Sequence, residues 1–213
     1  MQNMMKKEMY IQIGMQSIGV SLKENGRIIS SRDYSSDGQW EGTTEGILFK
    51  DLNDEEFKIG KKYDEEISVY NSGNIDEFVR IIITKTWQNA NGEKITDLSP
   101  EIIELNILEN NGWVIAEDQS TKERIVGYYT KSLSVGESTE NILDNLRVNE
   151  SINNEYKIIN NNGNIIIENA YDGYRFQIGL EVDAVQTHNA KDAIKSAWGV
   201  DVDVNSDETE IIF

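Results

Sequence analysis

Cysteine is absent from this chain of 213 residues, and histidine and proline occur once each. The lack of cysteine excludes disulfides, thiolate zinc sites and cysteine nucleophiles. The single histidine, His188, excludes the zinc-peptidase helix, which needs two histidines one turn apart. A lone histidine at a helix entrance is more often structural than catalytic. We therefore expect no cofactor, no bound metal and no enzymatic activity.

Positive charge and long apolar runs are also scarce. Lysine and arginine number 20 against 38 acidic residues, so the formal net charge is -18. A surface this acidic repels a phosphate backbone, which excludes nucleic acid as a partner. No stretch approaches the roughly 20 apolar residues of a membrane helix, so we expect no membrane span. The opening "MQNMMKKEM" has no apolar signal core, which indicates a cytosolic protein or one whose signal has been removed.

The acidic residues themselves are most simply a solvated, self-repelling surface. One run near the C-terminus, Asp201 to Asp207, is similar to the start of a calcium loop. An EF-hand loop needs glycine at its sixth position and glutamate at its twelfth. This chain has Ser206 and Ile212 there. The run is therefore interpreted as part of an acidic tail rather than as a calcium site.

The rest of the sequence consists mainly of short β runs separated by Asn, Gly and Asp turns. Residues 78–87 are apolar on both faces, which is typical of a central strand covered on both sides. Residues 174–184 alternate, with one apolar face. These patterns predict an all-β fold, a jelly-roll-like β-sandwich. Residues 23–45 are rich in Ser, Gly and Asp and predict a long exposed loop. Strands are expected in 63–71, 75–87, 101–108, 112–117, 123–133, 165–169 and 174–188.

One segment is predicted to be a short C-terminal helix. Asn189 can serve as its N-cap and Gly199 suits the left-handed position after its end. The apolar residues between them recur at helical spacing and include Trp198, which we expect to be buried across one end of the sandwich. Residues 138–151 are compatible with helix or strand. The domain is expected to span 17–202, and the tail 203–213 ends in an apolar clasp, 211–213, suited to docking on the core or to weak association.

The N-terminal residues break the strand alternation once. A first apolar face is followed by a second, shifted by one residue, which starts at Ile18. Because a one-residue slip moves every side chain to the other face, we infer two short strands with different partners. The first lies in an extension, residues 1–16, and its pattern alone allows an ordinary edge strand on its own domain. Its apolar face consists of Met9, Ile11, Ile13 and Met15.

Two blocks of sequence resemble the camelysin/TasA-like secreted proteins of Gram-positive bacteria. The first is "IGKKYDEEISVYNSGNIDEFVRIIITKTW" and the second is "GLEVDAVQTHNAKDAIKSAWGVDV". The resemblance runs from about Ser17 to Val202. At the family's early turn only Gly60 matches, because Ile59 and Lys61 replace its usual neighbours. The matching residues are Asn71, Gly73, Asn74, Val79, Arg80 and Trp87 in the first block and Gln186, Ala193, Trp198 and Gly199 in the second.

The resemblance implies a secreted jelly-roll domain at the cell surface or in the biofilm matrix. Members of this family form fibres in which an N-terminal donor strand adds to the sheet of the next subunit. It therefore implies that Met9 to Met15 are a donor strand and that the partners are copies of this chain in a head-to-tail filament, with accessory matrix subunits. Some relatives are described as metallopeptidases, but this chain has no HExxH motif. A monomeric surface adhesin, or a peptidase relative without a recognisable metal site, is the alternative.

Two lysines directly precede the expected donor strand. Many Gram-positive surface proteins link a lysine amine to an Asn or Asp side chain, assisted by a nearby protonated acid. Docking of the strand would carry Lys6 or Lys7 onto the next subunit, where such an isopeptide bond could form. A solvated basic pair is the simpler interpretation of the two residues.

Overall fold

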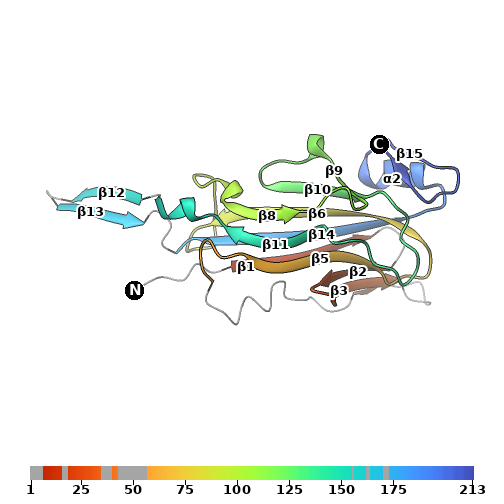
Figure 1. Cartoon of the computed structure of the whole chain (residues 1–213), viewed down its shortest axis with the longest axis horizontal. Helices are drawn as coiled ribbons and strands as arrows, with labels where there is room; N and C mark the ends of the chain where they lie inside the picture. The colour runs from red at the N-terminus through yellow and green to blue at the C-terminus, as the bar shows by residue number, and fades with distance from the viewer. Residues whose placement is uncertain are drawn as a thin grey trace.

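The computed structural model describes the backbone of residues 7–15, 19–34, 40–42, 57–154, 156–161, 164–169 and 173–213, and the side chains of 19–32, 57–153 and 173–213. Two six-stranded sheets pack face to face over most of this length (Figure 1). The chain changes sheet between β1 and β2, β5 and β6, β7 and β8, β8 and β9, β10 and β11, and β11 and β14. The predicted all-β sandwich with one short helix is confirmed.

Each sheet combines strands from distant parts of the chain, and short 3₁₀ turns lie between some of them. In spatial order, the first sheet contains β1 (Lys7–Met15), β14 (Arg175–Gln186), β6 (Glu77–Gln88), β10 (Arg124–Tyr129) and β9 (Trp113–Ile115), with β7 (Lys94–Ile95) beside the end of β6. The second contains β4 (Trp40–Gly42), β3 (Arg27–Tyr34), β2 (Val20–Glu24), β5 (Tyr63–Asn71), β11 (Leu143–Val148) and β8 (Ile103–Ile107). The turns are η1 (Pro100–Ile102), η2 (Glu117–Gln119) and η3 (Glu150–Asn154).

Two small ribbons lie outside the main sheets. Strands β12 (Tyr156–Asn161) and β13 (Asn164–Asn169) pair antiparallel with each other and project beyond one end of the sandwich (Figure 1). They flank the "NNNGN" stretch, as expected of a hairpin turn, although residues 162 and 163 lie outside the described residues. Strands β15 (Asp203–Val204) and β16 (Ile211–Ile212) form the second ribbon, beside the helix at the opposite end.

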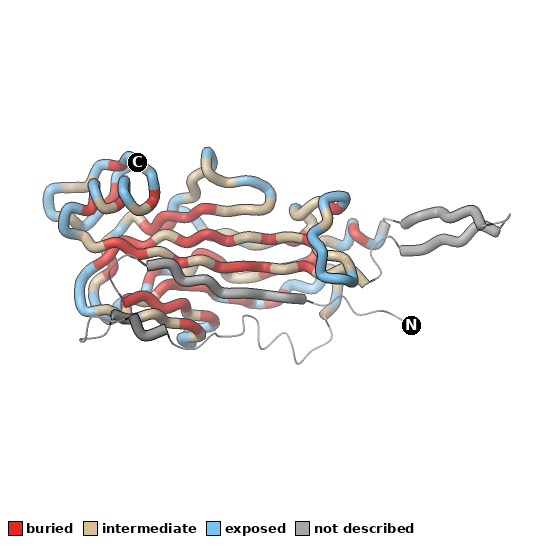
Figure 2. The backbone as a smooth tube through the Cα atoms, turned by 180° about the vertical axis from the view of Figure 1, so that it is seen from behind, coloured by how far each residue is buried: buried red, intermediate tan, exposed pale blue. Residues whose placement is uncertain are grey.

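The main core lies between the two sheets, where the buried segments of the strands face each other (Figure 2). From β6 it receives Val79, Ile81, Ile83 and Trp87, all at most 1% exposed. Lys85 belongs to the same row, and its Nζ donates to the Ile103 carbonyl oxygen of β8 at 2.7 Å. This bond ties the two sheets together. Burial lowers the pKa of Lys85, and the carboxylates of Glu101 and Glu104 partly offset this effect.

The other face of β6 is covered as well, which confirms the two-sided strand predicted from the sequence. Helix α2 (Ala190–Trp198) packs there over Phe78 and Ile82 and forms a second, smaller core. Trp198 is 9% exposed, and its ring lies 5.6 Å from the Tyr128 ring and 5.4 Å from the Arg80 guanidinium. Ile211 of the C-terminal clasp is buried in this core, and its N–H donates to the Thr130 carbonyl at 2.7 Å.

The helix begins differently from the sequence prediction. Asn189 occupies the N-cap position, but it has left-handed backbone angles with φ of 53° and its side chain makes no capping hydrogen bond. Its backbone N–H instead donates to the Glu208 carboxylate at 3.3 Å. Gly199 has the expected left-handed conformation at the other end, with φ of 71°.

The predicted loop over residues 23–45 is wrong, because β3 and β4 occupy much of it. Strand β3 pairs along β2, and its side chains do not follow a strong apolar alternation: Ser30 is buried whereas Ile28 is 51% exposed. Strand β3 forms because its main chain pairs with β2, although the β-strand propensity of its side chains does not predict it. The undecided segment 138–151 forms strand β11 followed by the beginning of η3.

Asn71 organises the turn between β5 and β6. The residue is fully buried, and its Nδ2 donates to the carbonyl oxygens of Ile75 and Leu133 at 2.8 and 2.9 Å. Its Oδ1 accepts from the Gly73 N–H at 2.9 Å. One side chain therefore holds the turn closed and fixes it to the segment that follows β10.

Replacing this side chain is expected to destabilise the fold. The Asn71→Ala variant removes three buried hydrogen bonds and should lower the free energy of unfolding by about 2 kcal/mol. Chemical denaturation followed by tryptophan fluorescence measures the loss. Asn74→Ala, at an exposed position of the same turn, is the matched control and should change stability by less than about 0.5 kcal/mol. Equal effects of the two variants would contradict the role assigned to Asn71.

Candidate assembly site

The outer edge of β14 is the main-chain surface on which β1 lies. Strand β1 pairs in parallel along it for nine residues, from Lys7 opposite Phe176 to Met15 opposite Ala184. Every other strand pairing in the described part of the chain is antiparallel. Strand β1 is an edge strand, so β14 depends on it to satisfy the hydrogen-bonding groups on that side.

The register places the predicted donor residues on the core side of the sheet. In a sheet, residues opposite each other in register point to the same face. Met9, Ile11, Ile13 and Met15 stand opposite the fully buried row of β14, which faces the core between the sheets. The residues of that row are Ile178, Leu180, Val182 and Ala184. The four residues chosen from the sequence therefore come together on one strand, and this structure places that strand in its own domain.

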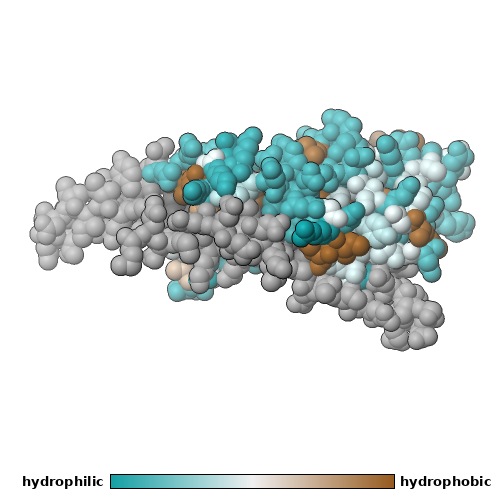
Figure 3. All heavy atoms as spheres, turned by 60° about the horizontal axis from the view of Figure 1, so that its bottom comes forward, coloured by the Kyte–Doolittle hydropathy of each residue, from teal (hydrophilic) through white to brown (hydrophobic). Residues whose placement is uncertain are grey.

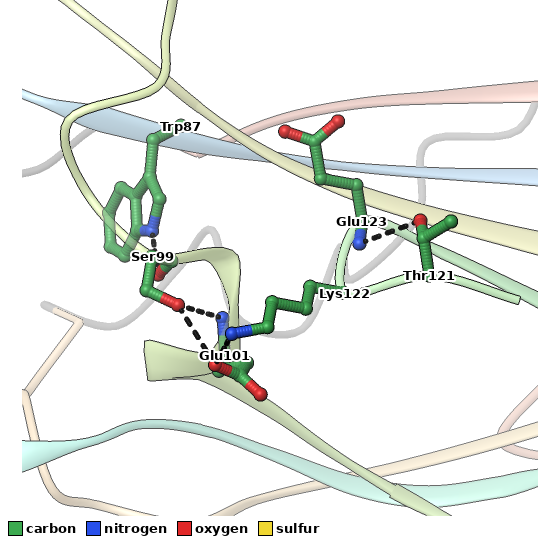
Figure 4. A network of polar contacts seen from close by, with 6 residues as sticks. All are labelled: Trp87, Ser99, Glu101, Thr121, Lys122 and Glu123. Atoms are coloured by element: carbon green, nitrogen blue, oxygen red, sulfur yellow. Dashed lines mark hydrogen bonds and ion pairs between the residues drawn. The ribbon is translucent and has the colours of Figure 1, made fainter.

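One end of this edge is closed by an aromatic and polar cluster. The Phe176 ring packs against Trp87 at 6.0 Å between centroids, and the Trp87 Nε1–H donates to the Ser99 carbonyl at 3.0 Å (Figure 4). The Ser99 hydroxyl accepts from the Glu101 N–H at 3.3 Å, and Lys122 pairs with the Glu101 carboxylate at 2.8 Å. These contacts fix the two rings beside the start of β14.

The outer face of β14 is charged rather than apolar. Asp183 forms an ion pair with Arg80 of β6. Two residues earlier, Glu181 lies opposite Gln12 of β1 in the register. Burial, together with the nearby Asp183 carboxylate, raises the pKa of Glu181, and Arg80 and Arg124 only partly oppose this. The folded protein therefore holds a carboxylate at the assembly edge at some cost in free energy.

The residues that carry the family resemblance lie mainly around the pairing of β6 with β14. The first block supplies β6 and the second supplies the end of β14 and α2. The two blocks meet where the Arg80 guanidinium lies over the Trp198 ring. Asn71, Trp87 and Gly199 each have a structural role in the turn, the core or the helix end. Four of the matched residues lie in the β6–β14 pair, and the others lie at the end of β5, in turns, and in or beside α2.

Other candidate sites in the described residues are weaker. No group of three or more His, Asp or Glu side chains there could hold a metal ion. His188 is 78% exposed, with Nδ1 3.8 Å from a Glu208 carboxylate oxygen. Two hollows among the described residues are a pocket of about 430 Å³ beside β9 and one of about 250 Å³ beside β8. Both are lined largely by asparagine and charged residues, and neither brings catalytic groups together.

The surface of the described residues is predominantly polar. The face in Figure 3 is mostly teal, and brown atoms form only a few small groups. Among the described residues, no helix has the length and apolar composition needed to cross a bilayer. The large apolar residues that are at least 40% exposed are Ile28, Ile75, Val114, Val135, Ile212 and Phe213.

Comparison with known proteins finds no match to a protein-family model, to a curated protein or to a solved structure.

The raised pKa of Glu181 predicts that neutralising this residue stabilises the fold. The folded state binds this proton more tightly than the unfolded chain, so stability increases as the pH falls through the raised pKa towards the ordinary value near 4.3. Glu181→Gln should raise Tm at pH 7, and its advantage over the wild type should shrink as the pH approaches about 4. Thermal unfolding followed by circular dichroism across this range measures both effects.

Glu104 in β8 provides a control, because its pKa is shifted in the opposite direction to that of Glu181. Asn149 Nδ2–H and Arg147 Nε–H donate to its carboxylate at 2.5 and 2.6 Å and lower its pKa. The ionised Glu104 carboxylate contributes its full stabilisation when the pH is above the pKa of the unfolded chain. This stabilisation is lost as the pH falls through the lowered pKa of the folded state. Glu104→Gln should therefore lower Tm at pH 7. A lower Tm for Glu181→Gln as well would mean that the attraction to Arg80 and Arg124 dominates.

Proposed function

We propose that this protein is the structural subunit of an extracellular fibre that assembles head to tail by exchange of strand β1. The observation that supports this most directly is an apolar strand at the extreme edge of a sheet, paired by main-chain bonds to β14. The same edge in a second copy offers the same main-chain hydrogen-bonding groups and the same buried row. Such strand addition is a recurring mode of protein recognition.

The acidity of the chain favours this mode of association over a broad surface contact. With a net charge of -18, two copies repel each other, and large faces can meet only at an electrostatic cost. Strand addition needs little area beyond the edge, and its main-chain hydrogen bonds do not depend on side-chain charge. Relative to an unpaired strand, each aliphatic side chain buried in a neighbour contributes about 2 kcal/mol, which replaces the same contribution in the strand's own sheet. For Ile11 and Ile13 together this is about 4 kcal/mol in either sheet.

A head-to-tail contact of this kind joins two different surfaces and does not close on itself. Repetition of the contact therefore produces a filament. The place of the filament, at the cell surface or in the biofilm matrix, rests on the resemblance to the camelysin/TasA-like proteins. Accessory matrix subunits are further proposed partners on the same basis.

A monomeric surface protein, such as an adhesin, is the second candidate. The observation that favours it is the pairing of β1 with β14 of its own chain, which completes the sheet without a partner. The two candidates differ in whether concentrated protein forms filaments. Negative-stain electron microscopy of concentrated protein tests the proposal directly, and globular particles alone at every concentration would reject the fibre.

Charge placed on the core side of β1 is expected to abolish assembly. Ile11→Asp together with Ile13→Asp puts carboxylates opposite the buried Leu180 and Val182. Burying an unpaired carboxylate is costly, so fibre yield should fall below detection by electron microscopy and sedimentation. The globular domain should keep a cooperative melting transition.

A matched control carries a new charge on the other face of the same strand. Gln12→Lys introduces a charge opposite Glu181, of opposite sign to that carboxylate, and should retain most of the fibre yield. Unchanged fibre yield in the double variant would remove β1 from the interface.

The fibre is also proposed to carry a covalent link through a lysine at the start of β1. The register places Lys7 opposite the buried Phe176, on the core side of the sheet, and Lys6 lies outside the described residues. The lysine amine would attack the carboxamide of an Asn side chain and release ammonia, or the carboxyl group of an Asp side chain and release water. Burial favours this reaction because it lowers the pKa of the lysine and raises that of the assisting acid.

Boiling assembled fibres in detergent tests the link. A ladder of oligomers that is lost in the Lys6→Ala, Lys7→Ala variant is the expected result. A single monomer band from wild-type fibres would show that the two lysines are a solvated pair and that non-covalent exchange holds the fibre together.

A further inference from the structure

The parallel direction of β1 constrains how the strand can leave its own sheet. The end of β1 at Met15 lies beside Ala184, near the end of β14. Strand β2 begins at the same end of the sandwich. Its first residue, Val20, pairs with Asn71, and the Asn71 side chain donates to the Leu133 carbonyl. Leu133 in turn forms main-chain hydrogen bonds with Glu77, which pairs with Gln186 at the end of β14. We call this the hinge end. The β12–β13 hairpin projects from the opposite end (Figure 1).

The connection between β1 and β2 is short. Four residues, 16–19, separate Met15 from Val20. Even fully extended, they allow at most about 18 Å between the two Cα atoms. The edge of β14 that β1 covers, from Phe176 to Ala184, is about 26 Å long at the usual rise per residue. If β1 leaves its own sheet and pairs with β14 of a neighbour, Met15 must therefore stay close to the donor's hinge end. It lies at the end of the neighbour's β14 that is nearest to that hinge end.

In a filament of subunits stacked end to end, the hinge end of one copy meets the hairpin end of the next. The exchanged strand then enters with Met15 beside the start of the neighbour's β14 and Lys7 towards its end. This direction is the reverse of the one in the single chain, and a linker of about 18 Å cannot reach the far end of a slot of about 26 Å. Only a copy turned round, hinge end to hinge end, could receive the strand in parallel, and that arrangement closes as a dimer.

We propose that β1 reverses its direction on assembly: it is parallel to β14 in the free subunit and antiparallel to β14 of the next subunit in the fibre. This inference rests on the proposed function, since it concerns the same strand and the same edge. The parallel form is a closed state in which the subunit fills its own assembly site. Antiparallel ladders are slightly more stable per residue than parallel ones, which favours the exchanged state once a neighbour is present.

The reversed strand keeps its apolar residues on the core side in one family of registers. If it pivots about Ile11 opposite Leu180, the donor residues again face the buried row, with Met9 opposite Val182 and Ile13 opposite Ile178. Gly14 then stands opposite Gln177. In the parallel register of the free subunit, Gln177 stands opposite Glu8 instead. The partner of Gln177 therefore distinguishes the two directions.

The absence of cysteine from the chain makes paired cysteines a direct readout. The Gly14→Cys, Gln177→Cys variant cannot link within a subunit, because Gly14 stands opposite Asp183, six residues along β14 from Gln177, and a disulfide needs Cα atoms within about 7 Å. Mild oxidation of its fibres should give a reducible ladder of oligomers. Because a slip by two residues keeps the same face inward, Gly14→Cys is also paired with Arg175→Cys and with Gly179→Cys.

The Glu8→Cys, Gln177→Cys variant is the matched control for the parallel form. Oxidised before assembly, it should run as a monomer with an internal link and should form no fibres until a reductant is added. When its fibres are oxidised after assembly, this variant should give no more disulfide-linked oligomers than the two single-cysteine variants give.

Two results would overturn the proposal in different ways. Fibres in which the Glu8→Cys, Gln177→Cys variant gives the ladder, and none of the Gly14→Cys pairs does, would show parallel exchange and reject the reversal alone. Covalent dimers without fibres, or no association in the wild type by electron microscopy, would reject the head-to-tail fibre and the reversal with it.

Discussion

The antiparallel pairing of β6 with β14 is the interaction on which the rest of the structure depends. Twelve residues of each strand pair without interruption, from Glu77 opposite Gln186 to Gln88 opposite Arg175. One face of the pair supplies the core between the sheets and the other receives α2 and the C-terminal clasp. The free edge of the pair at β14 is the place where β1 binds. The two cores and the assembly edge therefore share one scaffold.

Under the proposed function, this arrangement would let a very acidic chain offer an association site. Charge is concentrated on the solvent-facing sides of the sheets, as the Arg80–Asp183 pair and Glu181 illustrate. The edge of β14 presents main-chain groups and a row of apolar side chains that face inward. Recognition there relies on backbone geometry and burial, which long-range repulsion between copies does not remove.

The sequence predicted the elements whose pattern is set by burial, and it failed where main-chain pairing decides. The two-sided apolar run of β6 and the helical spacing that ends at Trp198 are both present as predicted, because burial on a defined face dictates those residues. The composition of β3 is typical of a loop, but Ser30 and Ser31 pair with β2, Asp33 pairs with β4, and Ile28 remains exposed. Asn189 stands at the helix start without the predicted cap, because its backbone is left-handed. The parallel partner of β1 left no trace in the alternation of Met9 to Met15, which fixes a face but not a direction.

The partnership of β1 with β14 also bears on how the chain folds. The two strands stand near opposite ends of the sequence, so their contact has one of the largest sequence separations in the molecule. Contacts of this kind form late, because the entropy of closing a long loop is lost before any hydrogen bond or apolar contact offsets it. During synthesis β1 is made first and β14 is made among the last elements, so the sheet cannot be completed until most of the chain exists. Until β14 has been made, β1 has no strand of its own chain to pair with in this sheet. In the proposed fibre, a folded neighbour with an open β14 edge would compete with the subunit's own β14 for β1.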